Sequence, residues 1–107
     1  MSLSIGNGAF APSDVTLYPA KTVSYTGTAG STGTWPPGPN KVMLFCTTAA
    51  YVAVGEAVTA TTSYTPVPAN TPITLEVPEG TGAPWRVSAI QIATGGDVYA
   101  KPGEMVV

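Results

Sequence analysis

Short apolar and alternating stretches, separated by glycine and proline, run along most of this chain. Threonine, valine, tyrosine and isoleucine are abundant, and no long stretch repeats apolar side chains at helical spacing. The clearest stretch is Ile73–Val77, in which apolar and polar residues alternate. Successive side chains of a strand point to opposite faces, so its apolar residues should face the core, and Thr74 and Glu76 should face the solvent. The pattern predicts an all-β fold.

Two nearly continuous apolar strands are predicted in the middle of the chain, over Lys41–Thr47 and Tyr51–Val54. The three small residues between them suit a tight hairpin turn. A strand that is apolar on both faces is usually covered on both sides, so we expect both strands at the centre of a sheet. The polar, threonine-rich stretch Thr59–Tyr64 is a candidate edge strand. The prolines that follow it, at positions 66, 68 and 72, lack the amide needed for regular pairing.

A second hairpin is predicted near the end of the chain, where Gly95–Gly96 joins Trp85–Thr94 to Asp97–Lys101. A pair of glycines suits a two-residue turn that needs positive φ. The residues expected on the inward side of this hairpin are Ile90, Ile92 and Tyr99. Six to eight short strands at this spacing indicate a single β-sandwich or a jelly-roll-like domain.

The first forty residues differ from the rest and predict an extended N-terminal arm, residues 1–40, ahead of a β-sandwich core, residues 41–107. Their glycine-rich stretch and the prolines after it, Gly27–Pro39, read as a flexible and then stiff connector. Two short β candidates precede this connector, Val15–Tyr18 and Thr22–Thr26. They could be edge strands or part of the extended arm.

Charge is sparse, with six acidic and four basic residues among 107, no histidine and a net charge of −2. The four cations are scattered singly, whereas nucleic-acid binding needs a clustered basic face, so no nucleic-acid partner is expected. No membrane partner is expected either, because no apolar run approaches the twenty residues of a span. The first residues lack the features of a secretory signal, so synthesis in the cytoplasm is expected. A surface so poor in charge favours a subunit of an assembly.

Most catalytic chemistry is missing from the composition. With one cysteine and no histidine, the chain has no ordinary zinc site, no disulfide and no histidine-based triad. Cys46 lies within an apolar run and reads as a buried structural thiol. The carboxylate pairs that could serve a glycosidase are Glu76 with Glu79 or with Asp97, and all three read better as solvated surface charges. We therefore expect no enzyme activity, no metal and no cofactor.

Four aromatic residues lie beside loops or strand ends and are candidates for binding: Trp35, Tyr51, Tyr64 and Trp85. Aromatic side chains stack on sugars and also anchor protein interfaces. Trp85 begins a predicted central strand and is the expected core member. Trp35 lies beside the proline-rich connector and is the expected contact residue.

The segment Val42–Tyr99 carries four successive patterns, VMLFCTT, AYVAVGE, PANTPITLEV and WRVSAIQIATGGDVYA. In these patterns the chain resembles small virion proteins of tailed bacteriophages, of the type that cements or decorates the capsid. The resemblance implies a structural, non-enzymatic protein on the capsid surface of the virion, with the major capsid protein as partner. It also implies a homo-oligomer, with a trimer favoured, and an arm that extends contacts over a neighbour. The expected anchors of that arm are Phe10, Tyr18, Tyr25 and Trp35.

Two alternatives remain open from the sequence. The loop-adjacent aromatics suit a carbohydrate- or receptor-binding module of a phage fibre or tail, with a glycan as possible ligand. A subunit of the tail or of the head-to-tail connector would have the same composition.

Overall fold

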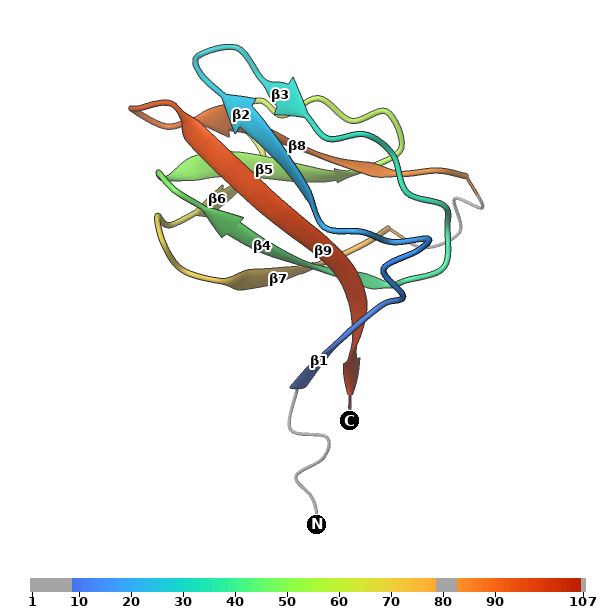
Figure 1. Cartoon of the computed structure of the whole chain (residues 1–107). Coiled ribbons are helices and arrows are strands. Elements are labelled where there is room, and N and C mark those ends of the chain that lie inside the picture. The colour runs from blue at the N-terminus through green and yellow to red at the C-terminus, as the bar shows by residue number, and fades with distance from the viewer. Residues whose placement is uncertain (1–8, 79–82, 107) are drawn as a thin grey trace.

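The computed structural model describes residues 9–78 and 83–106 (Figure 1). These residues form strands joined by turns and loops and contain no helix, so the all-β prediction is confirmed. The strands are β1 (Ala9–Pro12), β2 (Lys21–Tyr25), β3 (Gly30–Ser31), β4 (Lys41–Cys46), β5 (Ala50–Gly55), β6 (Thr65–Val67), β7 (Ile73–Glu76), β8 (Arg86–Gln91) and β9 (Gly96–Val106).

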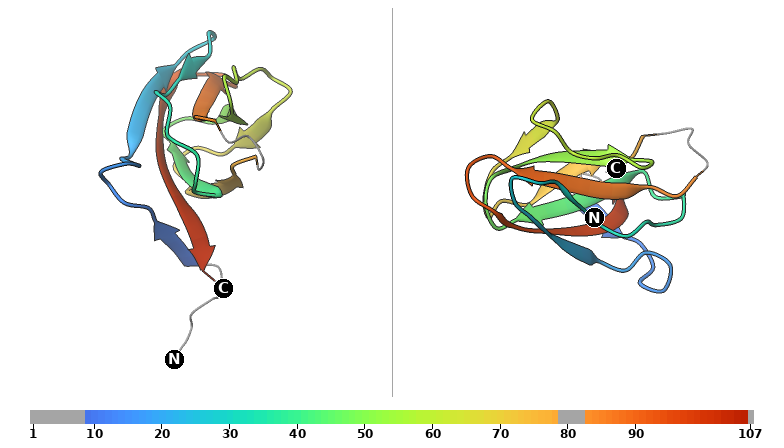
Figure 2. Two further views of the ribbon diagram at one scale, coloured as in Figure 1. Left: turned by 90° about the vertical axis from the view of Figure 1, so that its right-hand side faces the viewer. Right: turned by 90° about the horizontal axis from the view of Figure 1, so that it is seen from above.

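The strands form two antiparallel sheets (Figures 1 and 2). The five-stranded sheet has the order β1-β9-β4-β7, and β2 also pairs with β9. β1 and β2 follow one another along the edge of β9 opposite β4, since Lys21 pairs with Ala100 and Pro12 with Gly103. The four-stranded sheet has the order β3-β8-β5-β6. β9 and β4 are thus central in one sheet, and β8 and β5 in the other.

One hydrophobic core fills the space between the two sheets. In β4 every second residue is buried, and these are Val42, Leu44 and Cys46. β9 contributes Val98 and Ala100 beside them. The four-stranded sheet supplies the opposite wall, with Val52, Val67, Val87 and Ala89. The central placement predicted for the strands in Lys41–Thr47 and Tyr51–Val54 is confirmed, and so is the alternation of Ile73–Val77, because Ile73 and Leu75 pack on the core and Val77 is buried.

Both predicted hairpins are wrong, because each pair of strands is divided between the two sheets. β4 and β5 are connected by a crossing from the five-stranded to the four-stranded sheet, and β8 and β9 by the reverse crossing. The change of sheet also reverses the inward side predicted around Gly95–Gly96. Ile92 is 44% exposed and Tyr99 is 47% exposed, while Val98 and Ala100 face the core. Ile90 is half-buried and lies opposite Tyr51 on β5.

The predicted edge strand Thr59–Tyr64 is a loop, and the edge of the four-stranded sheet is β6. β6 contains Pro66, which a central strand would not tolerate but an edge strand does. The loop covers the outer side of the sheet, where the Ala60 amide donates to Ser88 Oγ at 2.9 Å and Arg86 Nε donates to the carbonyl of Val58 at 3.0 Å. These bonds explain how Ser88 is fully buried although its side chain points away from the core.

Residues 21–35 belong to the body of the fold. β2 pairs with β9 over five residues, and β3 pairs with β8. The other β candidate, Val15–Tyr18, is a turn. Residues on both sides of position 40 form the same two sheets. The strand pairing therefore shows no boundary at residue 40, where the sequence pattern indicates one.

The end of β9 and β1 form a two-stranded ribbon that projects from the two sheets (Figures 1 and 2). Phe10 of β1 lies over Gly103 of β9, where a Cβ atom would collide with the Phe10 ring and with the carbonyl of Ala11. Glycine at this position therefore allows the two strands and the aromatic ring to approach closely.

Candidate interaction surface

Three large apolar side chains lie on the outer face of the five-stranded sheet, the face turned away from the core. One of them, Tyr99, is exposed, and the other two, Met43 and Phe45, are half-buried. Phe45 of β4 and Tyr99 of β9 are paired in register, and their ring centroids lie 6.3 Å apart in an edge-to-face arrangement. Met43 is the next outward residue of β4. We call Met43, Phe45 and Tyr99 the apolar patch. The strand alternation places them outside, because Val42, Leu44 and Cys46 occupy the core.

A shallow hollow of about 140 Å³ lies in the apolar patch. Its walls are formed by Ala20, Met43, Leu44, Phe45, Tyr99, Ala100 and Lys101. Lys101 is the only charged residue among them, and its ammonium group donates to backbone carbonyls outside the hollow. The hollow is thus suited to an apolar side chain of a partner more than to a polar ligand.

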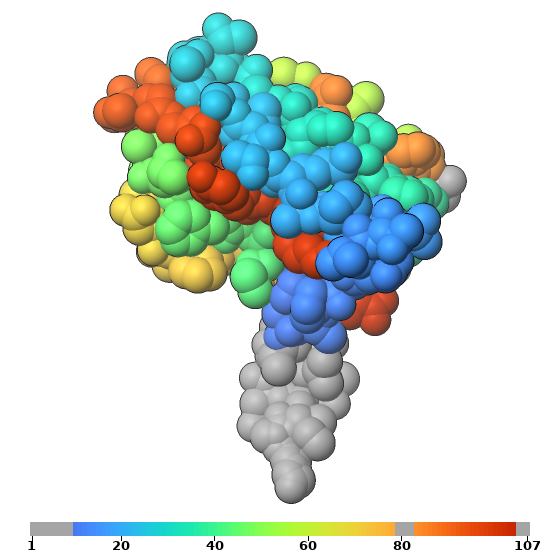
Figure 3. Space-filling view, in the orientation of Figure 1, coloured from blue at the N-terminus to red at the C-terminus, as the bar shows by residue number. Residues whose placement is uncertain are grey.

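The chain between Ser13 and Tyr18 forms a turn that stands out beside β2 and β9 (Figures 2 and 3). The carbonyl of Asp14 accepts a hydrogen bond from the Tyr18 amide at 2.8 Å, and Asp14 Oδ2 accepts one from the Leu17 amide at 3.3 Å. Lys101 Nζ donates to the carbonyls of Ser13 and Tyr18, both at 2.6 Å. The lysine on β9 therefore fixes both ends of the 13–18 turn.

The 13–18 turn presents the most exposed large apolar residues described in the chain. Val15 is 71% exposed and Leu17 is 57% exposed. Apolar side chains that a hydrogen-bonded turn holds in solvent contribute no free energy of burial to folding. They would contribute it to binding if a partner covered them. The 13–18 turn thus forms a raised edge, and the apolar patch beside it contains the hollow.

The polar groups around the patch bind one another. Ser24 Oγ donates to Asp97 Oδ1 at 2.6 Å, and Lys41 Nζ donates to Glu76 Oε2 at 3.1 Å. Glu76 lies opposite Lys41 at the start of β4, and Asp97 lies opposite Thr47, six residues further along the chain and just past the end of β4. At a rise of about 3.3 Å per residue, the two carboxylates are roughly 20 Å apart, too far for the two carboxyl groups of a glycosidase. Glu79, the other candidate, lies outside the described residues.

The four predicted anchors do not form a surface. Phe10 is half-buried over Gly103. Tyr18 is half-buried and donates its hydroxyl to the carbonyl of Pro37 at 3.0 Å. Tyr25 and Trp35 are 2% and 1% exposed and belong to the core, so neither can contact a neighbour.

Trp35 was expected to be a contact residue and Trp85 a core residue; only the second expectation is confirmed. The two residues exchange backbone hydrogen bonds of 2.8 and 3.0 Å, and their rings lie 4.8 Å apart. The indole N–H of Trp35 donates to the carbonyl of Pro19 at 2.8 Å, and that of Trp85 to the carbonyl of Pro36 at 3.1 Å. The proline-rich segment thus packs Trp35 inward. This burial could not be predicted from the residue type or from the neighbouring prolines in the sequence.

Cys46 is fully buried, as predicted. Burial raises the pKa of its thiol, and the Tyr25 hydroxyl opposes this rise only in part. Burial also raises the pKa of Tyr25, whose hydroxyl donates to the carbonyl of Thr48 at 2.6 Å. A thiol that stays protonated and enclosed is a poor nucleophile.

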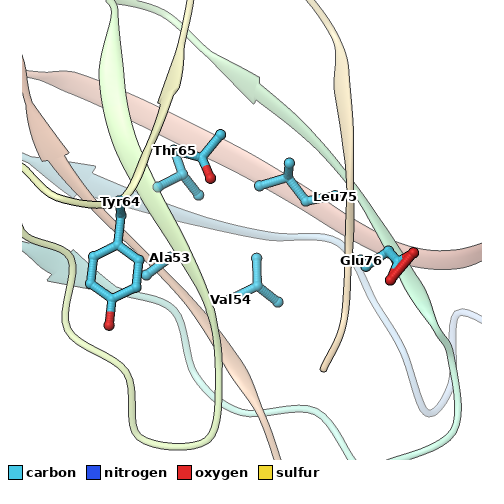
Figure 4. Close-up of a pocket in the computed structure, with 7 residues that line it drawn as sticks. Ala53, Val54, Tyr64, Thr65, Leu75 and Glu76 are labelled. Atoms are coloured by element: carbon cyan, nitrogen blue, oxygen red, sulfur yellow. The ribbon is translucent and has the colours of Figure 1, made fainter. Parts of the chain in front are cut away.

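No three histidine, cysteine or acidic side chains come close enough to hold a metal ion in the ranges 9–78 and 83–106. In the same part of the chain, no helix is long and apolar enough to cross a membrane. Two further hollows are present. One of about 310 Å³ lies at the loop end, lined by Thr47, Thr48, Ala49, Ala69, Ile92, Ala93 and Thr94. The other, of about 240 Å³, lies between the sheets at one side (Figure 4).

Comparison of the chain with models of protein families, with curated proteins and with solved structures gives no match. The candidate surface therefore depends on the geometry alone.

Proposed function

We propose that this chain is a non-enzymatic structural protein of a tailed-bacteriophage particle. In this proposal it is a β-sandwich that forms oligomers, with a trimer favoured, and that decorates or cements the capsid by bridging major capsid subunits. The observation that supports it best is the outer face of the five-stranded sheet, where the apolar patch and the 13–18 turn expose apolar side chains to solvent. Such a surface is typical of a protein that is covered by a partner.

The chemistry of this face favours binding over catalysis. The residues that line its hollow include no acid–base pair, and the nearby charged side chains of Lys41, Glu76 and Asp97 are held in hydrogen bonds with neighbouring side chains. A cement protein needs only a surface that fits an assembled lattice better than the free subunits, because binding to the assembled form alone stabilises that form by mass action. The proposed contact surface includes Leu17 and Tyr99 in place of the buried Tyr25 and Trp35.

The glycan-binding alternative is weakened by the burial of both tryptophans, because a stacking platform must be open to the sugar. Tyr64 and Tyr99, which are 43% and 47% exposed, are the aromatic residues that could still serve it. A tail or connector subunit would use the same apolar patch on a different lattice.

Co-sedimentation of the purified chain with capsid shells of the virus that encodes it tests the proposal. The chain should pellet with assembled shells and not with unassembled major capsid protein. Tyr99→Ser, in the apolar patch, should weaken shell binding at least tenfold. Ile92→Ser, an equally exposed apolar residue at the loop end, should bind as the unchanged protein does. Absence of shell binding would reject the capsid role, and equal losses in the two variants would reject this surface.

A further inference from the structure

The space between the two sheets is open along one side, at the edge formed by β5, β6 and β7. β6 has three residues and pairs only with Ala50–Val52 of β5, whereas β8 pairs with β5 over all six residues. Among the described residues, no strand continues β6 beside Ala53–Gly55. We call this edge, with the hollow behind it, the open side.

The backbone of Val54 points to the open side. Pro66 has no amide hydrogen, so its pair with Tyr51 is of the non-hydrogen-bonded kind, and Ala50 and Val52 are the residues that bond to β6. By the same alternation, the next residue of β5 whose backbone groups point toward the β6 side is Val54. Its partner on β8, Val87, supports this orientation. The amide and carbonyl of Val87 both bond to Thr32, at 3.1 and 2.8 Å, and therefore point away from Val54. Outside the strand pairing, no hydrogen bond of the Val54 backbone is found within residues 9–78 and 83–106.

The opposite wall of the open side is β7, the last strand of the five-stranded sheet. The Val77 amide donates to the carbonyl of Asn40 at 2.9 Å, which places Ile73 and Leu75 in the hydrogen-bonded register with β4. The backbone groups of Thr74 and Glu76 then point outward. Free strand edges of both sheets therefore border the opening.

A hollow of about 240 Å³ lies between these edges (Figure 4). Val52, Val54 and Leu75 form its apolar floor. Tyr64 and Glu76 lie on opposite sides of the opening, and both are exposed. The combination of an unpaired strand edge with an apolar hollow suits an added strand, because its backbone can bond to the edge while an alternate side chain fills the hollow.

The sequence ahead of β1 has the pattern of such a strand. Residues 1–8 read MSLSIGNG, in which Met1, Leu3 and Ile5 alternate with two serines. This period of two is typical of a strand buried on one face. β1 itself begins at the end of the ribbon that projects away from the two sheets (Figure 1). Eight extended residues reach at most about 29 Å, enough to cross to a neighbouring molecule.

We propose that residues 1–8 of one copy bind as a strand along the open side of a second copy, beside Ala53–Gly55, with Leu3 or Ile5 in the hollow. The proposal rests on the oligomerisation included in the proposed function and names the surface that would mediate it. Strand addition of this kind is head-to-tail, so it closes into a ring, such as a trimer, when the rotation between copies permits.

Two double variants of the full chain test the donor segment. Leu3→Glu with Ile5→Glu places charges on the apolar face of the segment, and the matched control, Ser2→Glu with Ser4→Glu, adds the same charge to its other face. Light scattering after size-exclusion chromatography should show an oligomer for the unchanged chain and the control. The first variant should be monomeric or dissociate at least tenfold more readily. A monomeric unchanged chain, or equal behaviour of the two variants, would overturn the proposal.

Cross-linking tests the acceptor site independently. Chains carrying Ile5→Cys are mixed with chains carrying Glu76→Cys, and disulfide-linked pairs are measured on non-reducing gels; the native Cys46 is buried in both. Thr22→Cys, exposed on the outer face of the five-stranded sheet, is the control and should remain unlinked. Equal linkage at the two positions would overturn the proposal. Shell binding is scored separately with Tyr99→Ser, so a failure of strand addition is distinguishable from a failure of the capsid role.

Discussion

Trp35 and Trp85, fifty residues apart in the chain, exchange two backbone hydrogen bonds, and their buried rings pack at a tilt of 35° with centroids 4.8 Å apart. Their indole N–H groups donate to the carbonyls of Pro19 and Pro36. The pair therefore ties the proline-rich segment, and through it the N-terminal third of the described chain, to the four-stranded sheet.

Trp35→Ala should lower the free energy of unfolding by about 3–5 kcal/mol, because it leaves a large cavity beside Trp85 and removes a buried hydrogen bond. Urea unfolding followed by the fluorescence of Trp85 measures the change. Trp35→Phe, which keeps a ring but not the N–H, should cost clearly less. A loss below about 1 kcal/mol for Trp35→Ala would contradict the tight packing of the two tryptophans.

Lys101→Met should release the 13–18 turn, because the ammonium group bonds to the carbonyls at both of its ends. The expected loss is about 1.5–3 kcal/mol, the range for hydrogen bonds to a charged group. Hydrogen exchange of the Leu17 and Tyr18 amides should accelerate. Lys41→Met, which removes an exposed pair with Glu76, should cost about 0–1 kcal/mol and leave that exchange unchanged. Unchanged hydrogen exchange of the Leu17 and Tyr18 amides in Lys101→Met would contradict the role of Lys101 in holding the 13–18 turn.

Stability should fall as pH rises through the alkaline range. Burial raises the pKa of the Cys46 thiol above its ordinary 9.0 and that of Tyr25 above 10.0, so the unfolded chain loses these protons at lower pH than the folded chain. The folded state then binds more protons, and unfolding is favoured progressively above about pH 9. Urea midpoints at pH 7 to 11 measure the slope. Cys46→Ala with Tyr25→Phe should flatten it, and an equally steep slope in that variant would reject these groups as the cause.

Gly103→Ala should disrupt the projecting ribbon, because the added Cβ collides with the Phe10 ring and the carbonyl of Ala11. Adding Phe10→Ala should restore only part of the lost stability, since the backbone collision remains. The coupling between the two changes, measured by a double-mutant cycle in thermal unfolding, should be about 0.5–3 kcal/mol. Strictly additive losses would show that Phe10 does not pack over residue 103.

The local sequence pattern was sufficient to predict the inward side of a strand that has one solvent-exposed face and one buried face. The alternation in Ile73–Val77 correctly gave its inward side, and the continuous apolar residues of β4 and β5 correctly gave their central positions. Both hairpins failed because strand periodicity is the same whether the next strand joins the same sheet or the opposite one. That error carried Ile92 and Tyr99 to the wrong face.

The candidate surface was harder to predict for the same reason. Tyr99 is exposed only because Val98 and Ala100 point inward, and no feature of the residues themselves distinguishes the two registers. Trp35 was misplaced because its burial depends on Trp85, a contact between distant parts of the chain. Val15 and Leu17 were read as a strand, although Asp14, which closes the 13–18 turn, was a usable signal: aspartate commonly accepts a bond from an amide a few residues on.

The order of the strands along the chain has a consequence for synthesis on the ribosome. β9 is the central strand to which β1, β2 and β4 pair, and it is made after all the other strands of the described residues. The five-stranded sheet cannot form before β9 leaves the exit tunnel, and until then the apolar stretch Val42–Cys46 has no neighbour on that edge. We expect folding to be a single late event that begins once β9 is available, slowed by the closure of long loops. Nascent chains stalled before Gly96 should therefore depend on chaperones to stay out of aggregates.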